Sequence, residues 1–132
     1  MDVLLGIDIG TGSTKGVLVD ISGNVLASET IAHSMDLPRP GWAEMDAEAT
    51  WWAEVCAIAR RLTAQTPAGA RLAAACVSGV GPCLVLSDET LRPLRPAILY
   101  GVDTRASREI ESLTDELGAD AILEQAGTAL SS

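Results

Sequence analysis

The sequence lacks long apolar runs, closely spaced cysteines and a second histidine. A membrane-spanning helix needs about 20 consecutive apolar residues, and the basic start of a signal peptide is also missing, so we expect a cytoplasmic protein without a membrane partner. The cysteines Cys56, Cys76 and Cys83 are odd in number and have no C-x-x-C spacing, which argues against a disulfide framework and a zinc site. Cys56 and Cys76 lie in apolar surroundings and are predicted to be buried thiols. His33 is isolated, and we expect no metal or general-base role for it.

Positive charge is also scarce. Lysine and arginine number 9 against 18 acidic residues, which gives a net charge of −9. This charge disfavours nucleic acid and anionic membranes as partners. A hydrophobic content of 48% argues against disorder, and 132 residues suffice for one domain with a real core. No internal repeat or low-complexity segment is visible, so the composition indicates one globular domain.

The most informative segment begins at Leu4 and ends at Asp20. It is an apolar strand that ends in the carboxylate of Asp8, then a tight turn of small residues, then a second apolar strand. Glycine lets a backbone approach a ligand, and successive N–H groups form an anion-binding nest. Magnesium prefers one or two carboxylates with phosphate oxygens and water, which suits Asp8. The sequence therefore predicts a metal–phosphate site, with the anion near Gly10, Thr11, Gly12, Ser13, Thr14 and Lys15.

Two common phosphate motifs are excluded here. A Walker loop requires G-x-x-x-x-G-K-[ST], whereas Lys15 lies between Thr14 and Gly16. A dinucleotide fingerprint opens a helix, whereas this chain enters a strand at Val17. A β-hairpin with no ligand is the alternative. The acidic residue at the end of the first strand favours a functional site.

The remaining pattern predicts an α/β fold with mixed strand directions. A helix is expected from Ala47 to about Gln65, with Asp46 as its N-cap and with an apolar stripe of Trp51, Val55, Ile58 and Leu62. Trp51 is expected in the core and Trp52 at its edge. A second helix is expected over 104–117, with Ala106, Ile110, Leu113 and Leu117 facing inward, and a third over 119–125. The strands are expected at residues 3–9, 16–19, 24–33, 72–80 (buried on both faces), 84–86 and 97–100.

Four segments together carry a family resemblance. They are Gly6–Lys15, Pro40–Asp46 (P-G-W-A-E-M-D), Ala75–Gly79, and Leu94–Tyr100 followed by Asp103-Thr104-Arg105. In this order they resemble the first phosphate motif, the G-W-x-E-x-D segment, the strand leading to the sugar site and the R-P-A-I-L-W…D-x-R segment of the FGGY carbohydrate kinases. The resemblance covers essentially all 132 residues. It implies the ribonuclease-H-like fold of the actin-like ATPase superfamily, with a mixed sheet.

The resemblance implies phosphoryl transfer from MgATP to a sugar hydroxyl, by default on a ketopentose such as xylulose. It assigns Mg²⁺ to Asp8, the β- and γ-phosphates to residues 10–14, and an added positive charge to Lys15. The family's catalytic base is an aspartate in a later segment, and it has no counterpart within these 132 residues. Residues 1–132 are therefore expected to be the N-terminal portion of the first of two kinase domains. This piece is expected to be inactive alone, and the full-length protein is a candidate homodimer.

The sugar site is expected at Gly81, Pro82, Cys83 and Asp103. Relatives that phosphorylate xylulose carry Q-M-H-G where this chain has Val80-Gly81-Pro82-Cys83, which offers backbone groups and shape instead of an imidazole or amide. Asp103 suits both hydrogen bonding to sugar hydroxyls and N-capping of a helix that begins at Thr104. Arg105 is expected either to steer phosphate or to pair with Glu109.

Two other functions are compatible with parts of the sequence. The chain could be a stand-alone, non-catalytic remnant that binds a nucleotide, a sugar or a protein partner. It could also be a chaperone- or actin-like ATPase, but such a protein does not predict the G-W-x-E-x-D segment or the P-A-I-L-Y segment. A sugar kinase accounts for all four segments.

Overall fold

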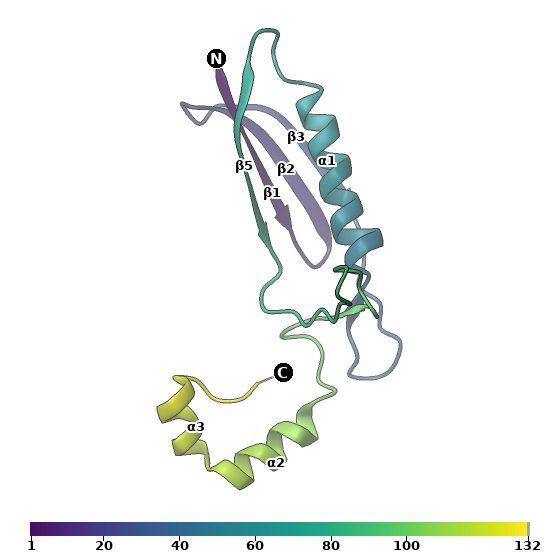
Figure 1. Cartoon of the computed structure of the whole chain (residues 1–132), viewed down its shortest axis with the longest axis vertical. Coiled ribbons are helices and arrows are strands. Elements are labelled where there is room, and N and C mark those ends of the chain that lie inside the picture. Colours follow the sequence, from purple (N-terminus) through teal and green to yellow (C-terminus); the bar gives the residue numbers. More distant parts are fainter. Residues whose placement is uncertain (132) are drawn as a thin grey trace.

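The three N-terminal segments that were expected as strands form an antiparallel meander. A computed structural model describes residues 1–131, with β1 (Asp2–Ile9), β2 (Ser13–Asp20) and β3 (Val25–Ala32) in antiparallel order. Strand β5 (Arg71–Gly79) adds to β1 in the parallel direction, which gives the sheet order β3-β2-β1-β5 (Figure 1). β1 therefore lies between one antiparallel and one parallel neighbour, and the sheet is mixed.

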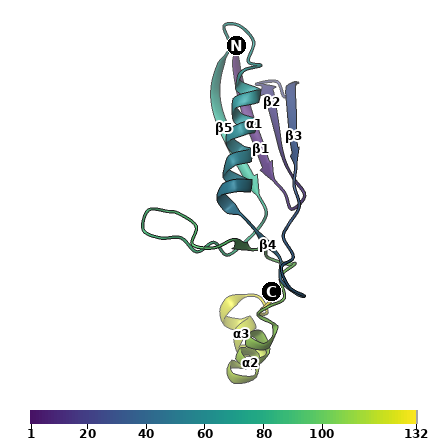
Figure 2. The same cartoon turned by 90° about the vertical axis from the view of Figure 1, so that its right-hand side faces the viewer.

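A single long helical segment packs on one face of this sheet. One π-helical stretch, η1 (Ala47–Trp52), leads into α1 (Ala53–Thr63), so the predicted helix exists as two consecutive elements. The Asp46 carboxylate accepts hydrogen bonds from two N–H groups of the first turn, which confirms it as the N-cap. Figure 2 shows α1 lying along β1, β2 and β3. The core between them is built from Val3, Leu5, Ile7, Leu18, Ile58 and Leu62.

A second, smaller cluster lies beyond the end of the sheet. It is organised by the antiparallel pair β4 (Glu44–Met45) and β6 (Ala97–Ile98). Ala43, Met45 and Leu99 are buried there, and Met35, Trp51 and Cys83 pack against them. Trp52 is 63% exposed, so the predicted difference between the two tryptophans is confirmed.

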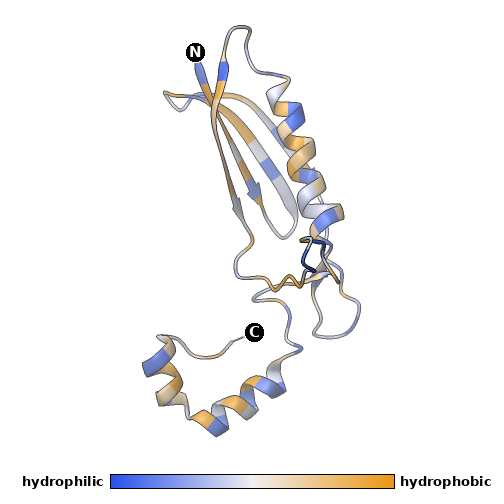
Figure 3. Cartoon of the chain, in the orientation of Figure 1, coloured by the Kyte–Doolittle hydropathy of each residue, from blue (hydrophilic) through white to orange (hydrophobic). Residues whose placement is uncertain are grey.

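The C-terminal helices lie apart from the sheet (Figure 1). They are α2 (Ser107–Leu117) and α3 (Ala119–Ala126), and they follow the predicted ranges to within a few residues. Gly118 and Gly127 end the two helices with positive φ, as glycine allows. The predicted inward stripe of α2 is wrong, because no residue of α2 is buried and Leu113 and Leu117 are exposed. Figure 3 shows apolar and polar residues alternating along both helices.

Three other expectations are wrong. β5 is exposed along its whole length instead of buried on both faces, because it lies at the sheet edge while α1 covers β1, β2 and β3. Cys76 is exposed for the same reason. Residues 84–86 form no strand, since only single bridges, Leu84 to Ile98 and Ser87 to Pro93, join this stretch to its neighbours.

None of the helices within residues 1–131 has the length and apolarity needed to span a bilayer.

Candidate active site

The parallel pairing of β1 and β5 brings two predicted site segments to one end of the sheet. Asp8 lies opposite Ser78 and Ile9 lies opposite Gly79. The Val80 N–H donates to the Ile9 carbonyl at 2.7 Å, so the chain leaves β5 beside the end of β1. Residues 10–13, here called the phosphate loop, follow β1 at this end. Ligands of open α/β sheets bind outside the carboxyl ends of parallel strands. The end of the sheet at which β1 and β5 finish is therefore the candidate site.

Asp8 is exposed at the end of β1. Its Oδ1 accepts a hydrogen bond from Ser78 Oγ at 2.5 Å. It is paired across the ladder with Lys15, and directly paired residues share a face of the sheet. This face lies opposite α1, because the alternating neighbour Ile7 is buried in the α1 core. Asp8 and Lys15 line a shallow hollow of about 190 Å³ together with Gly6, Ile7, Gly16 and Val17.

The phosphate loop is a tight connection between β1 and β2. The Gly10 N–H donates to the Ser13 carbonyl at 2.9 Å, which closes the loop. Thr11 and Gly12 are exposed at its tip. Four consecutive small residues leave the backbone accessible here, and the structure brings them next to Asp8 and Lys15, as predicted from the sequence.

Thr14 departs from the prediction. Its side chain is fully buried on the α1 face, and Oγ1 donates to Glu54 Oε2 at 2.5 Å. Successive residues of a strand point to opposite faces, so the exposure of Lys15 requires Thr14 to point inward. The expected presentation of the Thr14 hydroxyl to an anion is therefore wrong.

Sequence reasoning missed the contact between His33 and the phosphate loop. The His33 side chain is only 7% exposed, with Nδ1 at 2.8 Å from Glu54 Oε2 and Nε2 at 2.9 Å from the Gly10 carbonyl oxygen. His33 follows β3 and Glu54 lies in α1, 21 residues later. No local spacing links the two residues, so only the packing of α1 against β2 and β3 reveals the pair.

Asp103 lies in a second polar group, beside β4 and β6. Its side chain is 4% exposed and accepts hydrogen bonds from the Ala43 N–H at 2.7 Å and from the Arg105 guanidinium. The Arg105 hydrogen bonds, with that of Ala43, lower the pKa of Asp103 to about 2 although burial opposes this. The predicted N-cap role is wrong, because α2 begins at Ser107 and its N-cap is Ala106. The carboxylate instead fixes the 36–46 loop to the segment after β6.

Arg105 also differs from its prediction. Its Nη2 lies 2.8 Å from Glu44 Oε1 and pairs with Asp103, so the expected pairing with Glu109 is wrong. Glu44 also pairs with Arg95. The hydrogen bonds that Arg105 donates to Asp103 and Glu44 raise the pKa of Arg105. Its guanidinium carbon lies 3.8 Å from the centre of the Trp42 ring. These contacts form a network in which each charge has an opposite partner.

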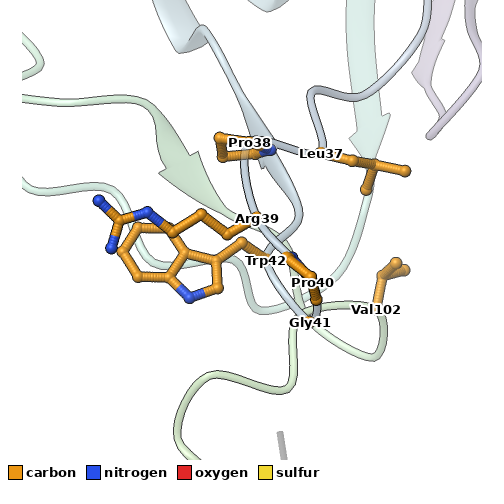
Figure 4. Close-up of a pocket in the computed structure, with 7 residues that line it drawn as sticks. All are labelled: Leu37, Pro38, Arg39, Pro40, Gly41, Trp42 and Val102. Carbon is orange, nitrogen blue, oxygen red and sulfur yellow. The ribbon is translucent and has the colours of Figure 1, made fainter.

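An apolar hollow lies beside this network. Figure 4 shows Arg39 alongside Trp42, with its guanidinium carbon 4.8 Å from the ring centre. The hollow has a volume of about 430 Å³ and is lined by residues 37–42 and Val102. Sequence analysis assigned no role to this loop beyond the family motif.

The predicted sugar segment, residues 81–83, follows β5 at the candidate site but is not joined to Asp103 within the described part of the chain. A Cβ on Gly81 would lie 3.7 Å from Tyr100 Cδ1, and the Cys83 N–H donates to the Gly81 carbonyl at 2.7 Å. The Cys83 side chain packs against the cluster of Ala43, Met45 and Leu99. Pro82 is exposed. Within residues 1–131, no hydrogen bond joins this segment to Asp103.

Asp8 is the residue that suits a magnesium ion. Among residues 1–131 no three His, Cys, Asp or Glu side chains converge as a ready-made metal cage. Magnesium in phosphoryl-transfer sites keeps several waters and takes one or two carboxylates together with phosphate oxygens. One exposed carboxylate beside a loop of accessible N–H groups fits that chemistry.

Comparison with known proteins identifies the family. Residues 3–132 match the N-terminal domain of the FGGY family of carbohydrate kinases. The chain belongs to this family. The Lactococcus lactis xylulose kinase is 34% identical over 119 residues, which cover 89% of this chain and 23% of that protein. The Bacillus subtilis gluconokinase is 32% identical over 95% of this chain and 24% of that protein.

Solved structures agree with this assignment. The Rhodospirillum rubrum xylulose kinase superposes with a TM-score of 0.84 at 34% identity, over 92% of this chain and 25% of that one. The Lactobacillus acidophilus gluconate kinase gives 0.85 at 26% identity, over 96% and 25%. The expected actin-like ATPase fold of the FGGY kinases is thereby confirmed. The chain spans about a quarter of the length of these relatives.

Proposed function

We propose that this chain is the N-terminal portion of the first domain of an ATP-dependent carbohydrate kinase. The observation that carries the proposal is the position of Asp8 beside the phosphate loop. Both lie at the end of the sheet where the chain leaves β5 toward Gly81 and Pro82. One carboxylate for Mg²⁺ and one accessible loop for phosphate are what this reaction requires from the first domain.

MgATP supplies the phosphoryl group in the proposed reaction, and the residues of this chain position it. Asp8 holds the magnesium ion, directly or through water, and Ser78 fixes the orientation of its carboxylate. The backbone N–H groups of the phosphate loop bind the β- and γ-phosphates. Lys15, on the same face as Asp8, adds positive charge. Such positioning and neutralisation account for most of the catalysis of phosphoryl transfer.

A ketopentose such as xylulose is the proposed acceptor. Support comes from relatives of 34–35% identity that are xylulose kinases. Glycerol kinases and a gluconokinase match at 31–33%, so these acceptors belong in the same test. Gly81 and Pro82 offer backbone groups to the sugar, and the Cys83 side chain packs away against its cluster.

The acceptor is tested by ADP release from the protein isolated at its natural length from its own cells. Xylulose, ribulose, gluconate and glycerol are compared at equal concentration with MgATP. We expect xylulose to give the highest kcat/KM. Higher kcat/KM for glycerol or gluconate would reject the ketopentose while retaining the kinase, and no sugar-dependent ADP release from any acceptor would reject the kinase.

A further inference from the structure

His33 contacts the phosphate loop at two separate points. Its ring Nε2 lies 2.9 Å from the Gly10 carbonyl oxygen, and its backbone N–H donates to the Gly12 carbonyl at 3.1 Å. The other ring nitrogen lies 2.8 Å from Glu54 Oε2. One residue at the end of β3 thereby joins the loop to α1.

These contacts determine which way the loop's N–H groups point. In a trans peptide the C=O and N–H groups point in opposite directions. The Gly10 carbonyl shares its peptide with the Thr11 N–H, and the Gly12 carbonyl shares its peptide with the Ser13 N–H. Because both carbonyls point toward His33, both N–H groups point away from it. The Thr11 N–H makes no hydrogen bond to another backbone group of residues 1–131, so it is free to receive an anion.

The contacts also fix one hydrogen of the ring. A carbonyl oxygen accepts hydrogen bonds and never donates, so Nε2 carries the hydrogen that it donates to the Gly10 carbonyl. Glu54 of α1 holds the opposite ring nitrogen, and the same carboxylate oxygen accepts from the Thr14 hydroxyl. Glu54 is the acidic group that faces His33 from α1, whereas Asp8 and Lys15 lie on the opposite face of the sheet.

We propose that His33 is a positioning residue for phosphate binding, with its ring held between the Gly10 carbonyl and Glu54. The inference rests on the proposed function, since it names the residue that orients the loop for the phosphates of ATP. Loss of the ring removes the contact to the Gly10 carbonyl and frees the peptide between Gly10 and Thr11 to rotate. Phosphate binding by the loop therefore weakens when the ring is removed.

The first test is nuclear magnetic resonance on the natural-length protein, with the His33 ring signals assigned by comparison with His33→Gln. Because the Gly10 carbonyl only accepts hydrogen bonds, we expect a hydrogen on Nε2. An Nε2 that carries no hydrogen would overturn the proposal.

The second test uses variants. In His33→Gln we expect exchange of the Thr11 amide to accelerate at least about tenfold, which corresponds to about 1.4 kcal/mol. Ser28→Ala, an exposed change on the same strand, serves as the control and should leave this rate unchanged. Glu54→Gln removes the partner charge and decides the question if His33→Gln does not fold. Unaltered exchange of the loop amides in the folded variant would overturn the proposal.

Binding of MgADP to the natural-length protein separates this inference from the proposed function. We expect tight binding to the wild type and binding about tenfold weaker to His33→Gln, which corresponds to about 1.4 kcal/mol. If the wild type binds no nucleotide, the proposed function fails even where the loop responds to His33. If the wild type binds and His33→Gln binds equally well, the positioning role fails and the proposed function stands.

Discussion

Gly16 of β2 lies directly beneath Ile58 of α1. A Cβ built on Gly16 would be 2.3 Å from Ile58 Cγ2 and 2.9 Å from Leu62 Cδ1, which is closer than carbon atoms can approach. The absence of a side chain at this position lets α1 approach the sheet. The third glycine after β1 therefore serves helix packing, while the glycines of the phosphate loop lie at the site.

Replacing Gly16 should loosen this packing. In Gly16→Ala we expect a loss of about 1–3 kcal/mol in the free energy of unfolding, because α1 must move outward to admit a methyl group. Urea unfolding measures the loss. Gly12→Ala is the matched control, since no atom lies within 4 Å of a Cβ at Gly12, and its effect on stability should be small. Equal stabilities of the two variants would contradict the packing role.

Two arginines contact the Trp42 ring, and they should differ in importance. Arg105 lies 3.8 Å from the ring centre and is paired with two carboxylates, whereas Arg39 lies 4.8 Å away in an exposed loop. Lysine lacks the planar fork that such pairing and stacking require. We expect Arg105→Lys to lower stability by about 1–2 kcal/mol and Arg39→Lys by less than about 0.5 kcal/mol. Urea unfolding measures the stability of the two variants. Equal losses of stability in Arg105→Lys and Arg39→Lys would show that the carboxylate pairing of Arg105 does not stabilise the protein.

The low pKa of Asp103 predicts how the stability of the protein falls in acid. Because the pKa falls from 3.8 to about 2 on folding, its stabilisation is complete above about pH 4 and is lost as the pH falls through about 2. Asp103→Asn should therefore cost roughly 3 kcal/mol near neutral pH, since Arg105 loses a buried partner. This difference from the wild type should shrink as the pH falls through that window. Glu89→Gln, an exposed change, should follow the wild type, and a pH-independent cost for Asp103→Asn would contradict the account.

Sequence patterns predicted the elements that depend on neighbouring residues. The two apolar strands around the tight turn, the Asp46 cap and the two C-terminal helices are local features, and all are present. The position of Asp8 beside the phosphate loop was also predictable, because both belong to one short segment.

Contacts between distant segments were not predictable from the sequence. Thr14 and Glu54 are 40 residues apart, and Asp8 and Ser78 are 70 apart. Asp103 precedes a helical pattern, which suggests an N-cap role beside the expected sugar contact, but its carboxylate accepts hydrogen bonds from Ala43 and Arg105. Tertiary hydrogen bonds to a charged partner outweighed the local capping preference, which contributes only about 1 kcal/mol.

Turnover of Asp8→Asn tests the central claim most directly. The variant keeps an oxygen to accept the Ser78 hydrogen bond and removes the charge that would hold Mg²⁺. In the natural-length protein we predict a fall in sugar-dependent ADP release of at least about 100-fold, with an unchanged melting temperature because Asp8 is exposed. Asp2→Asn, at the other end of β1, is the control and should retain wild-type turnover. Unchanged turnover in Asp8→Asn would contradict the assignment of this strand end as the magnesium–phosphate site.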